Sequence, residues 1–301
     1  MSIANFIPTI WSARLLDHLD KRHVYLNLLN RDYEGEIKNY GDTVKVNQIG
    51  EVTIKDYEKG KDIDAPEDLS GDQQELKIDQ AKYFNFAVDD VDNAQTNPKL
   101  MDKAMERAAY AMNDVVDAFA ANLLAVNVHA DNCIGSDTAP KTPTKSTAYD
   151  LLVDLGVKLT EANVPTVGRW VVIPAWYHGL LLKDDRFVGN GTDYNKAILE
   201  GGEVGKGAGF TIYVSNNVPN TTKTKYKIIG GTDQAGSFAE QILQTEAYRP
   251  EKRFSDAIKG LHVYGAKVFQ SKCISVLTAN PPVEESNTSS VEEPDTSSTG
   301  D

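Results

Sequence analysis

The sequence predicts an α+β fold, and three segments carry that prediction. Between residues 98 and 127, apolar side chains recur three or four positions apart, which is the spacing of one face of a long helix. Between residues 147 and 240, helical and extended patterns alternate, as they do where helices cover a sheet. Along residues 261–268, side chains alternate between two faces in the manner of a β-strand. We therefore expect a long helix, an α/β unit and a late strand.

The composition is that of a globular protein with an acidic surface. The chain has 301 residues, of which 41% are hydrophobic and 25% charged, so it can bury a substantial core. Its formal net charge of −13 argues against general nucleic-acid binding by the whole surface. The N-terminal residues lack the pattern of a secretory signal, and no stretch approaches the ~20 apolar residues of a membrane span. Two distant cysteines, Cys133 and Cys273, favour unpaired thiols in a reducing compartment.

The first eighty residues contain a leucine-rich segment, an extended segment and a polar segment. Residues 12–30 have leucines at helical spacing, and residues 42–54 carry valine and isoleucine in an extended pattern. Residues 55–79 are poor in large apolar side chains, which are limited to Tyr57, Ile63, Leu69, Leu76 and Ile78. Two interpretations of this polar segment are open. Its composition favours a disordered loop, and the alternative is a hairpin that becomes ordered on a neighbouring subunit.

The long helix is expected to run from Pro98 to about Asn127. Asn97 and Pro98 give a helix start, because asparagine caps the first turn and proline is tolerated at its first position. At 1.5 Å per residue, such a helix is about 45 Å long. A strand is expected just before it, at residues 83–88. The apolar stripe favours a helix that lies on a sheet, with packing in a helix bundle as the alternative.

A second compact unit is expected at residues 148–240, after a linker at 131–147 that is rich in proline, serine and threonine. Its predicted elements are helices at 147–162, 175–185 and 233–243 and strands at 169–174, 209–218 and 225–232. The glycine-rich residues 201–210 are interpreted as a flexible loop, because they fit neither a phosphate-binding loop nor a dinucleotide-binding pattern. The tail at 280–301 has six acidic residues and no basic residue, which indicates disorder.

No arrangement of catalytic or ligand-binding residues emerges. The acidic residues at 88–95 lack the ligand spacing of a calcium loop, and the five histidines show no zinc-binding spacing. The sequence contains no nucleophile elbow and no Cys-x-x-Cys pair. It therefore predicts no enzyme, no cofactor and no metal. The alternative of a soluble α/β enzyme would place a substrate near Trp176, His178 and Asp184.

The segment Thr245–Phe269 carries positive charge inside an acidic chain. Its first half carries the basic residues Arg249, Lys252, Arg253 and Lys259 against the acidic residues Glu246, Glu251 and Asp256, and its second half has the alternation of a strand. A basic strand with two usable faces needs a partner. That partner is a ligand, a nucleic acid or another copy of the chain.

Several long blocks, taken in this order, resemble the major capsid proteins of tailed bacteriophages that have the HK97 fold. The blocks are WSARLLDHLDK, NRDYEGEIKNYGDTVKVNQIGEVTIKDY, DQAKYFNFAVDDVD, AMERAAYAM, VDLGVKLTEANVPTVGRWVVIPAWYHGLLLKDDRFV, GFTIYVSNNVPN and TEAYRPEKRFSDAIKGLHVYGAKV. The resemblance covers residues 6–279. It implies a structural protein of the virion that self-assembles as pentamers and hexamers into an icosahedral head shell around double-stranded DNA. A cellular nanocompartment shell of the encapsulin type, which shares this fold, is the alternative.

The resemblance also gives each segment a place in that fold. The assignments are an N-terminal arm at 1–41, an extended E-loop hairpin at 42–82, a P-domain at 83–147 with its spine helix at about 98–127, an A-domain at 148–240, returning P-domain strands at 241–279 and a disordered tail at 280–301. Because E-loops of such proteins lie across an adjacent subunit, the resemblance favours the hairpin interpretation of residues 55–79. The implied partners are further copies of the chain, a separate scaffolding protein, a portal protein, a decoration protein and packaged DNA, with assembly in the bacterial host cytoplasm and no membrane.

The resemblance suggests what the basic segment contacts. Its side chains are expected to meet acidic side chains on the E-loop of a neighbouring copy. The expected interface residues are Arg249, Lys252, Arg253 and Lys259 on one copy, and Glu58, Asp62, Asp64, Glu67, Asp68 and Asp72 on the other. Exposed ion pairs add little stability each, so we expect them to set the register and curvature of the shell more than its strength.

Overall fold

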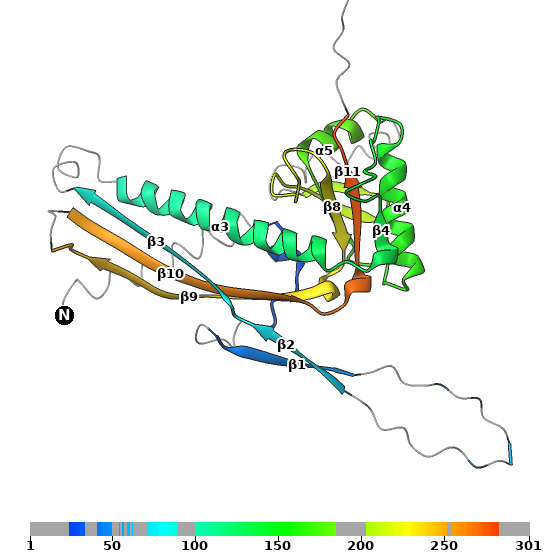
Figure 1. The fold of residues 1–301 in the computed structure, drawn as a ribbon, viewed down its shortest axis with the longest axis horizontal. Coiled ribbons are helices and arrows are strands. Elements are labelled where there is room, and N and C mark those ends of the chain that lie inside the picture. The colour runs from blue at the N-terminus through cyan, green and yellow to red at the C-terminus, as the bar shows by residue number, and fades with distance from the viewer. Residues whose placement is uncertain are drawn as a thin grey trace, which may run out of the picture.

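The computed structural model describes residues 24–33, 41–49, 71–89, 100–184, 203–251 and 255–282, together with the single positions 54, 56, 59, 60 and 62. These residues form two parts that join at one end of a long helix (Figure 1). The elongated part contains a hairpin, a three-stranded sheet and that helix. The compact part is built around a six-stranded sheet.

The hairpin consists of β1 (Thr43–Ile49) and β2 (Gly71–Lys77), which pair antiparallel along their whole lengths. Val44, Leu76 and Ile78 are buried on one face of its base, while Lys45, Glu75 and Lys77 are exposed. This alternation follows from the two-residue period of a strand. Residues 71–77 of the polar segment are therefore the second strand of a hairpin, which lies below the three-stranded sheet in Figure 1.

The three-stranded sheet has β10 (Ser255–Val268) between β3 (Gln80–Asp89) and β9 (Gly236–Tyr248), and all its pairs are antiparallel. The helix α3 (Leu100–Val126) lies along one face of this sheet, as the sequence favoured (Figure 1). Phe84 and Phe86 of β3 pack with Met105 and Met112 of α3, so this sheet face is the one that the helix covers. The 27 residues of α3 make a helix about 40 Å long.

The six-stranded sheet has the strand order β4-β11-β8-β5-β7-β6. Its strands are β4 (Cys133–Ile134), β5 (Trp170–Ile173), β6 (Glu203–Gly207), β7 (Phe210–Val214), β8 (Tyr226–Gly231) and β11 (Ile274–Ala279). The helices α4 (Ala148–Glu161) and α5 (Ala175–Leu181) pack with it. All residues of β5 and β11 are buried, which is expected for strands covered on both faces.

One hydrophobic core joins the two parts. Val116, Ala120 and Leu124 from the C-terminal half of α3 belong to the same buried cluster as Leu152 of α4 and Ile229 of β8. Tyr25 and Leu26 contribute to it from a short 3₁₀ helix, Leu26–Leu28, which precedes the hairpin. Three other 3₁₀ helices lie at Ala130–Asn132, Asp233–Ala235 and Ser271–Cys273. Because the cluster is shared, the end of α3 and the six-stranded sheet behave as one packed unit.

The helix predicted at residues 233–243 is wrong. Only Asp233–Ala235 is helical, as one 3₁₀ turn, and β9 begins at Gly236 and runs on to Tyr248. Alanine, glutamate, glutamine and leucine in this stretch favour a helix locally. The register with β10, from Val268↔Gly236 to Ala257↔Tyr248, gives strand partners to Gly236–Ile242 instead, and Leu243 falls at the register shift. Tertiary pairing therefore outweighs the local preference.

Two segments interpreted as loop or linker are partly strands. Glu203–Gly207 forms β6 and pairs with β7 through a tight turn in which Ala208 and Gly209 both have positive φ, 52° and 81°. The predicted linker at 131–147 contains β4, which pairs with β11. Thus the six-stranded sheet includes residues 133–134 and 274–279, which the sequence placed with the elongated part.

Candidate functional site: the open sheet face, the hairpin base and the arm contacts

The face of the three-stranded sheet opposite α3 carries an ordered polar and aromatic network. Lys259 of β10 lies between Asn85 of β3 and Glu246 of β9 in the register of the sheet. Its ammonium group is 2.9 Å from a carboxylate oxygen of Glu246 and 5.4 Å from the centre of the Tyr248 ring. The Tyr248 hydroxyl and the Asn85 side chain are hydrogen-bonded at 3.0 Å. We call these residues, together with Tyr83, the open sheet face.

Tyr83 makes the open sheet face a candidate contact surface. Its side chain is 79% exposed on β3, which is an edge strand of the sheet. An exposed tyrosine beside fixed polar groups is typical of the residues that anchor protein interfaces. The bond from Glu246 raises the pKa of Lys259, so this side chain stays charged at physiological pH.

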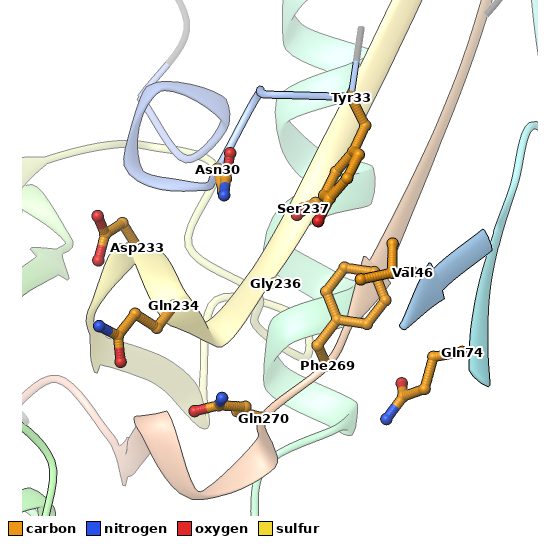
Figure 2. A pocket seen from close by; sticks show the side chains of 10 residues that line it. All are labelled: Asn30, Tyr33, Val46, Gln74, Asp233, Gln234, Gly236, Ser237, Phe269 and Gln270. Atoms are coloured by element: carbon orange, nitrogen blue, oxygen red, sulfur yellow. The ribbon is translucent and has the colours of Figure 1, made fainter. Parts of the chain in front are cut away.

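The base of the hairpin packs against the same side of the sheet. Val44, Leu76 and Ile78 of the hairpin form a buried cluster with Ala239 of β9 and Val263 of β10. A cavity of about 210 Å³ lies beside this cluster (Figure 2). Its walls come from five stretches of the chain: Asn30, Tyr33, Val46, Gln74, Asp233, Gln234, Gly236, Ser237, Phe269 and Gln270. The hairpin therefore leaves the sheet beside a cavity that is lined by both polar and apolar side chains.

Gly265 sets how closely the hairpin approaches the sheet. A Cβ atom at this position would collide with the backbone of Lys77 and Ile78. We expect Gly265→Val to displace the hairpin base and to destabilise the unassembled subunit by about 2 kcal/mol, because overpacking against backbone is costly. Urea unfolding would measure this loss. The matched control is Gly179→Val in α5, where a Cβ atom would meet nothing within 4 Å and the backbone is not in the left-handed region; equal losses in the two variants would contradict the proximity argument.

A backbone hydrogen bond and a cluster of charged side chains fix the residues before the hairpin to the sheet. Asn30 forms a bridge with Ser237, and the backbone N–H of Phe238 donates to the carbonyl of Asn30 at 2.9 Å. Next to it, Arg31 contacts one carboxylate oxygen of Glu240 at 2.6 Å, and His262 of β10 contacts the other oxygen at 3.1 Å. The side chains of Glu240 and His262 are buried. One carboxylate thus holds two segments in place.

A second buried carboxylate, Asp117 of α3, holds the segment at residues 24–26. One of its oxygens accepts the backbone N–H groups of Val24 at 3.1 Å and Tyr25 at 2.8 Å. Its other oxygen lies 3.5 Å from the side-chain nitrogen of Asn217, in the loop after β7. Burial raises the pKa of Asp117 to about 6, although these hydrogen bonds act in the opposite direction. Asp117 therefore connects the arm, the long helix and the compact part.

The raised pKa of Asp117 makes stability depend on pH in a definite direction. The pKa of Asp117 is near 3.8 in the unfolded chain and about 6 in the folded protein. At pH values between these two, the folded protein holds a proton that the unfolded chain has released. The stabilisation from the protonated acid is thus complete below pH 4 and is lost as the pH rises through 6. In Asp117→Asn, whose amide keeps an acceptor for both backbone N–H groups, we expect this part of the pH dependence to disappear. Urea unfolding of the subunit between pH 4 and 8 tests this, and parallel pH profiles for wild type and variant would contradict it.

Comparison with known proteins places this chain in a family. The family model described as phage capsid protein matches residues 72–276, which is more than half of the chain. The chain belongs to the phage capsid protein family. It is a structural, shell-forming major capsid protein and not an enzyme.

Solved structures agree with this assignment. The capsid protein is similar to a chain of Mycobacterium phage Che8, with 31% identity and a TM-score of 0.66, over 85% of this chain and 91% of that chain. The capsid of cyanophage P-SCSP1u has 16% identity and a TM-score of 0.63, over 87% and 89% of the two chains. The holo-SrpI encapsulin of Synechococcus elongatus has 12% identity and a TM-score of 0.52, over 81% and 84%. The last two likenesses show the fold alone. No curated protein matches the sequence.

The residues near which an enzyme would have placed its substrate, Trp176, His178 and Asp184, lie in or beside the core of the capsid protein. The Trp176 ring contacts the rings of Tyr177 and Tyr226 edge-on, at 5.4 and 5.6 Å between centres. Burial lowers the pKa of His178, and Asp184 is buried near the end of α5. Within the described residues, no group of three His, Cys, Asp or Glu side chains could hold a metal ion, and no helix is long and apolar enough to cross a membrane. Both cysteines are free thiols.

Part of the predicted ionic interface can be located in the structure. Arg249 is exposed just after β9, and Asp62 is exposed on the outer part of the hairpin. Asp72 lies in β2. Lys259 lies on the open sheet face, where Glu246 of the same chain already contacts it. Glu58, Asp64, Glu67, Asp68, Lys252 and Arg253 lie outside the described residues, so the pairing between copies stays a prediction.

The sequence did not point to the residues that hold the arm. Asp117 and Asn113 lie one turn apart on α3 and are both buried. The sequence signal that could have indicated Asp117 is its position beside the predicted apolar stripe of the helix. A carboxylate buried there needs hydrogen-bond donors from another segment. The Arg31–Glu240–His262 contacts gave no such signal, since nothing in the sequence pairs positions 209 residues apart.

Proposed function

We propose that this capsid protein builds an icosahedral head shell around double-stranded DNA, and that the hairpin of each copy lies on the open sheet face of an adjacent copy. The observation that carries the proposal is the hairpin itself, whose described base packs against its own subunit through Val44, Leu76 and Ile78. Farther out, Ile54 is 90% exposed. Ordering an extended hairpin costs conformational entropy, and contact with another copy offsets that cost.

We assign each segment of the chain to one part of the capsid fold. Residues 1–41 act as the N-terminal arm, 42–82 as the E-loop, and 83–147 with 241–279 as the P-domain. Residues 148–240 act as the A-domain, which gathers around the symmetry axes, and 280–301 form an acidic tail. Support for this division comes from the separate hairpin, the sheet with its long helix and the six-stranded sheet. In this proposal β4 and β11 move to the A-domain, because they complete its sheet.

Opposite charges on the hairpin and on the segment Arg249–Lys259 favour contact between these two parts of adjacent copies. The sequence that joins β1 to β2 has acidic residues at positions 58, 62, 64, 67 and 68, β2 adds Asp72, and the segment Arg249–Lys259 is rich in basic residues. Lys259 already forms an ion pair with Glu246 of its own chain, so an acidic residue of the hairpin would have to share it with Glu246. Arg249, Lys252 and Arg253 then become the main partners of the acidic hairpin. Electrostatic complementarity of this kind selects register and suppresses wrong contacts.

The further partners are proposed from the same resemblance. Assembly is expected in the cytoplasm of a bacterial host, with a separate scaffolding protein, a portal protein at one vertex and a decoration protein on the outer surface. The packaged DNA would be contacted without sequence specificity. The net charge of −13 suits such loose contact, because an anionic protein does not hold DNA tightly.

Charge reversal at the basic segment tests the proposal. We expect Arg253→Glu to give absent or misassembled shells, while the far-ultraviolet circular dichroism of the subunit stays that of wild type. The matched control is Lys227→Glu, which reverses a charge at an exposed ion pair with Asp137 on the compact part, and shells should form from it. Negative-stain electron microscopy of cell lysates reads out the result. Normal shells from Arg253→Glu would refute the proposed role of this segment.

A further inference from the structure

Tyr248 of the open sheet face lies across the sheet instead of standing away from it. It belongs to β9, and its register partner on β10 is Ala257. Its hydroxyl nevertheless reaches Asn85 on β3, the strand on the other side of β10, at 3.0 Å. Neighbouring strands lie about 4.8 Å apart, so the side chains of Tyr248 and Asn85 together bridge about 10 Å. The ring therefore leans over β10, where the small residue Ala257 is buried.

The bridging ring gives the side chain of Lys259 a fixed place. Its ammonium group is 5.4 Å from the centre of the Tyr248 ring and 2.9 Å from a carboxylate oxygen of Glu246. An ammonium group has three N–H donors, and within the described part of the chain only Glu246 accepts from this one. Two donors are therefore left for a partner. Because the long side chain is held before the partner arrives, the contact costs less conformational entropy.

We propose that the open sheet face holds the Lys259 ammonium in place for a carboxylate on the hairpin of an adjacent copy. Tyr248 and Glu246 hold it by direct contact, whereas Asn85 is a positioning residue, because its hydrogen bond is to Tyr248. The inference rests on the proposed function, in which that hairpin covers this face, and it adds which group receives the hairpin. A carboxylate is the expected partner because the sequence between β1 and β2 is rich in acidic residues.

Paired substitutions test the role of Asn85. Asn85→Ala and Tyr248→Phe each remove one end of the same hydrogen bond, and each should lower the fraction of capsid protein in closed shells about fivefold. The double variant should be no worse than either single variant, because the bond is already lost in both. Sucrose-gradient sedimentation of lysates from cells that produce shells measures the fraction. The matched control is Asn122→Ala, which removes an exposed amide bonded within α3 and should leave the fraction unchanged.

Urea unfolding of the unassembled subunit separates a positioning role from a structural one. Asn85 is exposed, so we expect the unfolding midpoint of Asn85→Ala to equal that of wild type while the shells are lost. A fall in the midpoint that parallels the loss of shells would show a structural role and overturn the inference. Losses of shells that add up in the double variant would also overturn it, because the two residues would then act independently.

Amine labelling tests the contact of Lys259 itself. N-hydroxysuccinimidyl acetate should acetylate Lys259 about fivefold more slowly in wild-type shells than in the unassembled subunit, as measured by mass spectrometry, because its two remaining donors are covered in the shell. Equal rates would overturn the contact. Normal shells from Asn85→Ala would overturn the positioning role and leave the proposed function intact. That function fails only if a chain that lacks residues 50–70 also gives normal shells.

Discussion

Replacing residues 50–70 with the two-residue turn Asn-Gly will give a folded subunit that forms no closed shells. Ile49 and Gly71 are the last residue of β1 and the first of β2, and they are paired directly. A two-residue turn can therefore close the shortened hairpin without changing its register. The buried cluster at the hairpin base remains, so the loss in unfolding free energy should be small. What disappears is the segment between β1 and β2, which the proposal places on an adjacent copy.

The experiment needs a control for the loss of chain length. Ending the chain after Pro282 removes a similar number of residues from outside the hairpin, and we expect shells from that variant. Both variants are compared with wild type in cells that produce shells, by size-exclusion chromatography of the lysate and by electron microscopy. Closed shells of wild-type diameter from the shortened hairpin would contradict the proposed role of residues 50–70.

Glu240→Gln is expected to destabilise the subunit by about 2 kcal/mol. The substitution keeps the size of the side chain and removes the charge that holds both Arg31 and His262. Hydrogen bonds to charged groups that are shielded from water contribute more than neutral ones, which sets this magnitude. Arg31 is only partly buried, so its share of the loss is reduced by water. Urea unfolding of the unassembled subunit measures the difference.

Glu246→Gln is the matched control for Glu240→Gln. It is the same chemical change on the same strand, at an ion pair with Lys259 whose side chains are both about half exposed. We expect almost no change in the unfolding free energy, because exposed ion pairs contribute little. A loss at Glu246 as large as that at Glu240 would show that burial does not decide the effect. Faster trypsin cleavage after Arg31 in Glu240→Gln would additionally show that the arm is released.

The elements with strong local signals were predictable from the sequence. The long helix was expected at 98–127 and runs from Leu100 to Val126, because its apolar stripe continues for seven turns. The helix expected at 147–162 is Ala148–Glu161, and the strands at β5, β7 and β8 lie where their apolar runs are. In each case local preference and the tertiary contacts favour the same structure.

The rest of the fold depends on contacts between distant residues. β9 was predicted partly as a helix, because only its pairing with β10 makes it a strand. The alternation of β10 was predicted, but a bulge between Leu261 and His262 shifts its register with β9, and His262, Val263 and Tyr264 are all buried. The candidate site has the same limit. Its basic residues were visible in the sequence, whereas the contacts of Glu240 and Asp117 with the arm join positions about a hundred or more residues apart.

The most direct test of the account is a cryo-electron microscopy reconstruction of shells purified from cells that express this chain together with a candidate scaffolding protein. The account predicts closed particles of uniform diameter, in which each hairpin crosses to an adjacent subunit and covers the open sheet face at Tyr83 and Tyr248. Closed particles in which that face is bare and the hairpin folds back on its own subunit would contradict it.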